Sequence, residues 1–168
     1  MKQEIKFLGH VINQNGKHTE STKIEAIKNF QRSICIKKFW LFLRITNYYR
    51  RFIKNYTDFS KILECLCGSN MKKLFWTDDC EEAFQFLKEQ LIKSPVLIFS
   101  DFTNEFILDT DASFDYIGPV LAQLDENRNK RVIAYGSKSM NKHELTYCIT
   151  RKKLLVIFYF THHFKHYL

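Results

Sequence analysis

The stretch FILDTDAS, residues 106–113, decides the fold of the C-terminal half of the chain. Apolar residues alternate up to the acids, so Phe106 and Leu108 share one face of a strand, and Asp109 and Asp111 share the other. A carboxylate at the tip of a buried strand usually faces a metal ion, a proton or a cation. The first question that the sequence raises is therefore what Asp111 faces.

Three strands and one closing helix are expected around this stretch. The strands are EFILDTDAS (105–113), IGPVLAQL (117–124) and RVIAYGSKS (131–139), and the helix covers roughly KKLLVIFYFTHHFKHYL (152–168). Pro119 falls inside the second strand, where a residue without an N–H is tolerated mainly at an edge or a bulge. Strands followed by a helix, with helices before them, predict the α+β class.

The first half of the chain predicts one hairpin and four helices. IKFLGHVINQNGK (5–17) is typical of a strand, a turn at Asn15-Gly16 and the start of a return strand. In the last of the four helices Thr77 is a natural N-cap, acids fill the first turn, and Pro95 stops the helix. The four segments are KIEAIKNF (23–30), IKKFWLFLRITNYYRRFI (36–53), TDFSKILECLC (57–67) and TDDCEEAFQFLKEQLIKS (77–94).

Charge is distributed unevenly along the 168 residues. Residues 1–76 hold 15 Lys and Arg against 5 Asp and Glu, residues 77–129 hold 3 against 12, and residues 130–168 hold 8 against 1. The basic first block suits a polyanion such as a nucleic acid, although lysines that only keep a protein in solution would give the same count.

The cysteines and the apolar runs indicate the compartment. The five cysteines are odd in number and widely spread, and Cys65-x-Cys67 lacks the second ligand pair of a zinc site, so we expect reduced thiols. No apolar signal segment follows Met1, and the longest apolar run, residues 154–160, is too short to span a bilayer. We expect an intracellular protein, cytoplasmic or nuclear, that is not secreted and has no membrane partner.

A series of segments in a specific order resembles the Pol polyprotein of gypsy-type LTR retrotransposons. They are FLGHVI (7–12), KIEAIKNF (23–30), NYYRRFI (47–53), FWTDDCEEAFQFLKEQLIKSPVL (75–97), FILDTDAS (106–113), RVIAYGSKSMNKHELTY (131–147) and HFKHYL (163–168). The resemblance implies the end of a reverse transcriptase palm, with a primer-grip-like hairpin, and a helical thumb-like module. A connecting helix and linker would follow, and then the N-terminal half of a ribonuclease H-like domain. The implied bounds are 1–16, 17–75, 76–103 and 104–168.

The resemblance implies two activities for the parent family, RNA-directed DNA polymerisation and ribonuclease H cleavage. The polymerase carboxylates of that family lie on a Tyr-x-Asp-Asp hairpin, and no such motif occurs in residues 1–168. Its position would lie before Met1, so this chain alone is not expected to polymerise DNA.

The implied ribonuclease H site is altered at its second carboxylate. The family cleaves with two Mg²⁺ ions held by clustered carboxylates, the first of which falls on Asp111. The second, in a pattern similar to Tyr-x-x-x-Glu-x-Glu-Leu-Leu, falls on Lys153 of YCITRKKLL (147–155), and the remaining ones would lie after Leu168. An ammonium group removes a ligand and repels the ions. We therefore expect Asp111 to be a catalytic remnant, a metal ligand only if other carboxylates are supplied, with no Mg²⁺ bound stably.

The other charges around this site have simpler expected roles. A salt bridge between Lys153 and Asp111 and the absence of such a bridge are equally expected. Glu144, the only acid after residue 129, lies nine residues before Lys153 and is not expected to replace the missing ligand. Asp109 is expected to have a surface or capping role.

The basic helix is the better functional candidate, and the partner that it implies is an RNA/DNA or DNA duplex bound without regard to sequence. The remainder of a Pol polyprotein is the second expected partner. Arg44 stands where the family has the Gly of a Phe-Leu-Gly motif, which adds charge but restricts close approach to a groove. The expected nucleic-acid-binding residues are Gly9, His10, Lys37, Lys38, Arg44, Asn47, Arg50, Arg51 and Lys54.

Several alternatives stay open from the sequence. Trp40, Tyr48 and Tyr49 suit either stacking on bases or core packing, with core packing favoured. The histidines at 162, 163 and 166 favour ordinary surface over a ligand cluster. A host-adopted or decayed module, which binds nucleic acid or a protein without catalysis, is the alternative to a Pol fragment, because the unfinished sheet would leave an edge open to pairing.

Overall fold

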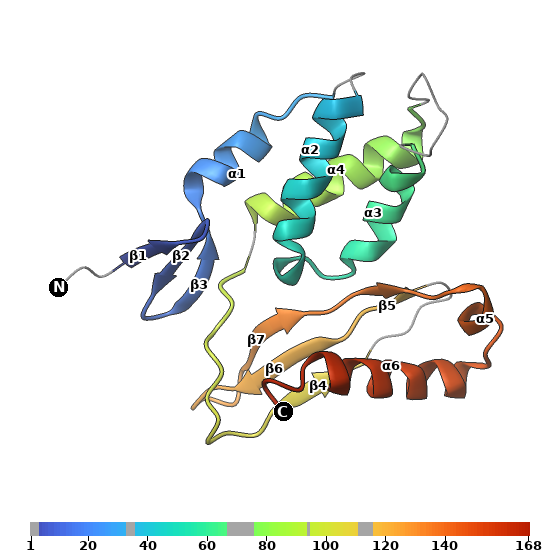
Figure 1. Cartoon of the computed structure of the whole chain (residues 1–168). Helices are drawn as coiled ribbons and strands as arrows, with labels where there is room; N and C mark the ends of the chain where they lie inside the picture. The colour runs from blue at the N-terminus through green and yellow to red at the C-terminus, as the bar shows by residue number, and fades with distance from the viewer. Residues whose placement is uncertain (1–3, 33–35, 67–75, 94, 111–115) are drawn as a thin grey trace.

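The computed structural model describes residues 4–32, 36–66, 76–93, 95–110 and 116–168. A small sheet, a group of helices and a second sheet follow one another along the chain, and a long helix closes it (Figure 1). Among the helices of these residues, none is long and apolar enough to cross a membrane.

The N-terminal sheet has three antiparallel strands in the order β1-β2-β3, which are Glu4–Phe7, His10–Asn13 and Gly16–Thr19. The prediction of one continuous first strand was wrong, because the chain turns between β1 and β2. Leu8 and Gly9 form this turn with left-handed φ angles of 46° and 72°. Two consecutive residues with positive φ give the turn whose twist matches a tight hairpin. The predicted turn at Asn15 and Gly16 is the second turn of this sheet.

Four helices pack together above the second sheet (Figure 1). They are α1 (Ser21–Lys28), α2 (Ile36–Tyr48), α3 (Tyr56–Cys65) and α4 (Asp78–Ile92). The helix predicted over 36–53 is shorter, since it ends at Tyr48 and a separate 3₁₀ turn, η1 (Arg50–Phe52), follows. Thr77 caps α4 as predicted, because its side-chain oxygen accepts a hydrogen bond from the Cys80 N–H at 3.4 Å.

The second sheet contains β4 (Ile107–Asp109), β6 (Val120–Leu124) and β7 (Lys130–Tyr135), antiparallel and in the order β4-β6-β7. A two-stranded extension pairs β5 (Tyr116–Ile117) with β8 (Lys138–Ser139). Pro119 lies between β5 and β6, at a break in the second predicted strand, and its carbonyl accepts a hydrogen bond from the Gly136 N–H at 2.8 Å. The predicted α+β class, with three antiparallel strands followed by a helix, is confirmed.

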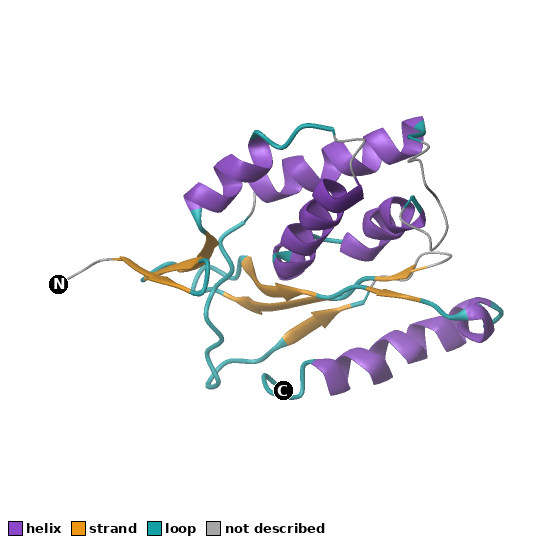
Figure 2. Cartoon of the chain, turned by 45° about the horizontal axis from the view of Figure 1, so that its top comes forward, coloured by secondary structure: helices purple, strands orange, loops and turns teal. Residues whose placement is uncertain are grey.

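Strand β7 lies between two apolar cores. Val132 and Tyr135 pack against the helical core, whose buried residues include Phe42, Phe84 and Leu87. Ile133 belongs to the second core, formed with α6 (Ile149–His163). Figure 2 shows the helical group and α6 on opposite sides of the sheet. The sheet is thus a middle layer, as expected when both faces of a sheet are apolar.

The segment Leu97–Ile98 joins the two sheets through their backbones. Lys17 donates its N–H to the Leu97 carbonyl at 2.7 Å, and Leu97 returns a bond to the Lys17 carbonyl at 3.0 Å. Ile98 then donates to the Val132 carbonyl of β7 at 2.9 Å. Gly16 permits this contact, because a Cβ there would lie 2.3 Å from the Leu97 oxygen.

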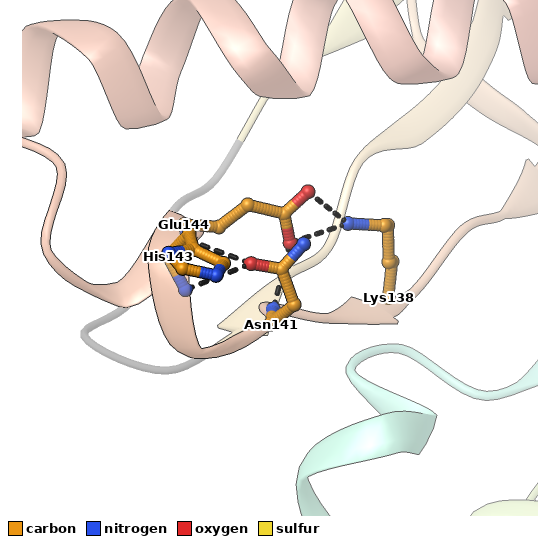
Figure 3. Close-up of polar contacts among 4 residues, drawn as sticks. All are labelled: Lys138, Asn141, His143 and Glu144. Carbon is orange, nitrogen blue, oxygen red and sulfur yellow. Dashed lines mark hydrogen bonds and ion pairs between the residues drawn. The ribbon is translucent and has the colours of Figure 1, made fainter.

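A polar network fixes the short helix α5 (Lys142–Leu145) at the end of β8 (Figure 3). The Asn141 side chain accepts hydrogen bonds from the N–H groups of His143 and Glu144, at 3.0 and 2.8 Å. The Glu144 carboxylate accepts from the Asn141 N–H at 2.7 Å and from Lys138 at 2.8 Å. Lys138 also lies 5.0 Å from the centre of the Tyr159 ring, which connects the network to α6.

Substitution of Gly16 by alanine is expected to lower the free energy of unfolding. The φ angle of 136° at Gly16 is costly for any residue with a Cβ, by roughly 1–3 kcal/mol, and the overlap with Leu97 adds to this. Urea denaturation measures the change. The exposed neighbour Gln14, replaced by alanine, is the control and should change stability by less than about 0.5 kcal/mol. Equal stability of Gly16→Ala and wild type would contradict the tight contact.

Replacement of Glu144 by glutamine is expected to lower the free energy of unfolding at pH 7 by about 1 kcal/mol, because the amide oxygen still accepts from the Asn141 N–H but the charge-assisted bonds with Lys138 are lost. Burial alone would raise the pKa of Glu144, but hydrogen bonds from Lys138 and Asn141 outweigh it and lower the pKa below its ordinary 4.5. Its stabilisation is therefore present above pH 4.5 and is lost as the pH falls through the lowered pKa.

The difference between wild type and Glu144→Gln should accordingly shrink in acid, which denaturation curves at a series of pH values would show. Glu126→Gln, in the exposed turn after β6, is the matched control. A difference that stays constant down to the lowest pH would mean that the carboxylate charge does not contribute.

Candidate nucleic-acid interface

The outer face of α2 brings together part of the predicted basic set. Lys37 and Arg44 are exposed and lie seven residues apart, and Leu41 and Tyr48 extend the same face. Lys38 and Asn47 are exposed on the flanks of this face. The buried side of α2 carries Phe39, Phe42, Leu43 and Thr46. The helix therefore presents cations to solvent because its apolar residues are used by the core.

The three aromatic residues Trp40, Tyr48 and Tyr49, on α2 and directly after it, differ in burial. Tyr49 is 1% exposed, so the prediction of core packing is confirmed for this residue. Trp40 and Tyr48 are 44% and 51% exposed, so the same prediction was wrong for both. The Trp40 ring is partly open to solvent, and the Tyr48 ring is partly covered by the stacked His10 ring.

Tyr48 and Tyr49 hold the turn at Leu8 and Gly9 against the end of α2. The Tyr49 hydroxyl donates to the Gly9 carbonyl at 2.6 Å, and the Tyr48 hydroxyl donates to the Leu8 carbonyl. Burial raises the pKa of Tyr49 to about 12, so this donor stays protonated at neutral pH. Gly9 thus has a structural contact, and the hairpin and α2 form one surface.

The remaining predicted residues lie apart from the outer face of α2. Arg50 and Arg51 belong to η1, which contacts β7, and their exposed side chains line cavities between the helices and the sheet. His10 stacks on the rings of Tyr48 and Phe52, with centroids 5.2 and 5.6 Å away. Lys54 is exposed in the turn after η1. The predicted set therefore divides into an α2 face and a second group, His10, Arg50 and Arg51, which lines cavities next to the sheet. We call this second group the junction group.

Lys17 is a cation that the sequence reasoning missed. It lines the same cavity as His10 and Arg51. The pairing of β3 with β2 places Lys17 opposite Ile12, two residues along the strand from His10. The signal available in the sequence was its position directly after the Asn15-Gly16 turn, on the strand next to His10.

The implied ribonuclease site is described only in part. Asp111 lies outside the described residues, so its expected pairing with Lys153 stays a prediction. Lys153 is exposed on α6, whereas Lys152 is 7% exposed and shares the inner face of the helix with Val156 and Phe160. The lysine of this pair that turns toward the sheet is therefore Lys152.

The neighbouring acids are engaged elsewhere. Both oxygens of Glu144 are bound by Lys138, and Asp109 forms an ion pair with Lys130 at 2.7 Å across the sheet. Within the described ranges, which leave out Asp111, no three side chains of His, Cys, Asp or Glu gather as metal ligands. Among the described residues, therefore, no group of free carboxylates is present for the two-Mg²⁺ site that the resemblance implies.

Comparison with known proteins identifies the family. A family model described as "RNase H-like domain found in reverse transcriptase" matches residues 76–168. The Pol polyproteins of transposons 412 and 297 of Drosophila melanogaster are each 36% identical, over 98% and 100% of this chain. The Tf2-3 polyprotein of Schizosaccharomyces pombe is 29% identical over 99%. The chain spans only 12–15% of the length of these relatives.

Solved structures show the same fold. The foamy viral protease-reverse transcriptase in complex with double-stranded DNA is similar with a TM-score of 0.81 and 22% identity, over 94% of this chain and 27% of that one. The complex with an RNA/DNA hybrid also gives 0.81, at 21% identity, over 97% and 22%. The chain therefore belongs to the RNase H-like domain family of reverse transcriptases, in the setting of the Pol polyproteins of LTR retrotransposons.

Proposed function

We propose that this Pol segment binds a template–primer duplex through backbone phosphates and is catalytically incompetent on its own. The observation that carries the proposal is the outer face of α2, where Lys37, Lys38 and Arg44 are exposed. None of the three forms an ion pair with another described residue, so their charges are available to phosphates. Exposed cations without base-reading partners imply binding that ignores sequence.

The solved relatives support this proposal by their partners. The foamy viral proteins of the same fold are bound to double-stranded DNA and to an RNA/DNA hybrid. The exposed rings of Trp40 and Tyr48 lie on or beside the cationic face, as in surfaces that combine phosphate contacts with stacking. We place the protein inside the cell, with the remainder of Pol as its second partner.

Removal of the three α2 charges tests the duplex-binding proposal. In the triple variant Lys37→Gln, Lys38→Gln and Arg44→Gln, the affinity for a labelled RNA/DNA hybrid should fall at low salt. The slope of log K against log salt concentration should become shallower by about 0.9 for each phosphate that the variant no longer neutralises. Fluorescence anisotropy over a salt series measures both quantities.

A second triple variant controls for the change in net charge. Lys142, Lys153 and Lys165 are exposed on or near α5 and α6, and their replacement by glutamine removes the same charge from another part of the protein. This control should keep the wild-type salt slope. If both triple variants weakened binding equally, binding would depend on the net charge of the protein and not on the cations of α2.

The second half of the proposal is the lack of nuclease activity. The purified chain should leave the RNA strand of a labelled hybrid intact in Mg²⁺, because Lys153 stands at the position of a carboxylate and no ligand cluster forms among the described side chains. Denaturing gels of the RNA strand give the result. Mg²⁺-dependent cleavage that disappears in Asp111→Asn would refute incompetence and leave duplex binding unaffected.

The alternative of a protein-interaction module has one observation in its favour. The outer side of α6 exposes Ile149, Leu154 and Phe158, and β4 pairs only with β6 among the described strands. An open strand edge beside apolar residues favours association. No described contact indicates what covers this face, whereas the α2 cations specify the chemistry of their partner. Duplex binding is therefore the function that we prefer.

A further inference from the structure

Two adjoining cavities lie where the hairpin sheet, η1, β7 and α6 meet, and we call them together the junction pocket. The larger cavity has a volume of about 160 Å³ and includes His10, Lys17 and Arg51 in its wall. The smaller has about 60 Å³ and includes Arg50, Arg51 and His163. Arg51 lines both cavities, which makes it the centre of the pocket.

The wall of the junction pocket is cationic and carries no counter-charge. Neither cavity has an Asp or a Glu among the described residues that line it. Within the part of the chain that the structure describes, no ion pair involves Lys17, Arg50 or Arg51. Like charges in a partly enclosed space repel one another, so an arrangement of this kind is stabilised by a bound anion.

The two histidines of the pocket respond to this charge. Burial, followed by the charge of Lys17 and then that of Arg51, lowers the pKa of His10. Burial, followed by the charges of Arg51 and Arg50, lowers the pKa of His163. Both rings therefore lie in the positive field of these cations.

Ring stacking and backbone hydrogen bonds fix the parts of the wall that carry His10, His163 and Lys17. His10 is stacked between Tyr48 and Phe52, and His163 stacks against Tyr159 with the ring planes 11° apart. Lys17 is positioned by its two backbone bonds to Leu97. A pocket whose rings and backbone are held in this way needs little backbone reordering when an anion binds, which favours binding.

We infer that the junction pocket binds a single phosphate-class oxyanion, with Arg51 as the central ligand and Lys17 and Arg50 on either side. A guanidinium group offers paired N–H donors that match two oxygens of a phosphate, and an ammonium adds a point charge. The hydroxyls of Ser100 and Ser137, one in the wall of each cavity, supply neutral donors. The larger cavity has the volume of about five water molecules at about 30 Å³ each, which is enough for a phosphate or a pyrophosphate anion.

The phosphate has two sources with the same chemistry, a nucleic-acid backbone or a free phosphate compound. The inference does not depend on the α2 face, because the junction pocket shares none of the three cations Lys37, Lys38 and Arg44. Its failure and the failure of duplex binding on α2 are therefore separate results.

Pyrophosphate is the probe for the site. Thermal unfolding of the full chain should shift upward with pyrophosphate concentration, beyond the shift in sodium chloride of equal ionic strength. Calorimetric titration then gives the affinity and a stoichiometry of one. An equal effect of both salts, or no saturable binding, would overturn the inference.

Four variants assign the binding to the pocket. Arg51→Gln and Lys17→Gln should each weaken pyrophosphate binding about tenfold or more, as the removal of a hydrogen bond to a charged group requires. Arg51→Lys should recover part of the affinity. Lys23→Gln, an exposed cation on α1 outside both cavities, should bind like wild type. If Arg51→Gln folds and also binds like wild type, the assignment fails; if it does not fold, Lys17→Gln, on another element, decides in the same way.

Competition with a labelled duplex separates the two sources. Displacement of the duplex by pyrophosphate in wild type, but not in Arg51→Gln, would assign the pocket to a backbone phosphate. Simultaneous binding of both would assign it to a free phosphate. The α2 triple variant should bind pyrophosphate normally in either case, and failure to bind pyrophosphate there would contradict a separate pocket.

Discussion

The backbone connection at Leu97 and Ile98 is the contact on which the rest of the structure depends. Three hydrogen bonds in two consecutive residues join β3 to β7, and each contributes on the order of 1 kcal/mol. Without them the hairpin sheet would be tied to the rest mainly by the two tyrosine hydroxyls. The same bonds place Lys17 beside Arg51, so the junction pocket is a consequence of how the two sheets are joined. Gly16 makes the approach possible because it has no Cβ.

The elements that depend on local sequence were predictable, and those that depend on distant partners were not. Thr77 and the acids after it specify the start of α4, and Pro119 marks the break between β5 and β6. The turn at Leu8 was missed because a leucine with positive φ has no local signature. It is held by Tyr48, which lies 40 residues further along the chain. The Leu97 connection was missed for the same reason, since backbone bonds carry no side-chain pattern.

The predicted basic set shows how a local irregularity reorganises a surface. Had α2 continued to residue 53 as predicted, Arg51 would have followed Arg44 and Lys37 at helical spacing on one exposed face. The helix instead ends at Tyr48, and η1 turns the two arginines toward β7. The sequence identifies which residues are cationic, but their division into an α2 face and a junction group required the structure. The burial of Tyr49 explains the turn, because its side chain enters the core at this point.

Binding to a duplex and cleavage by a two-metal site differ in how precisely the side chains must be placed. Binding to phosphates requires exposed cations at approximate positions, and each contributes nearly independently through released counterions. A two-metal site requires several carboxylates within a few ångströms, and one ammonium among them removes a ligand and repels the ions. A lysine at 153, where the resemblance implies a glutamate, is therefore expected to weaken the second property while adding to the first. In this chain Glu144 near α6 is used in a cap and in an ion pair with Lys138, whereas Lys37, Lys38 and Arg44 on α2 remain exposed. The duplex binding that we propose therefore does not depend on a complete metal site.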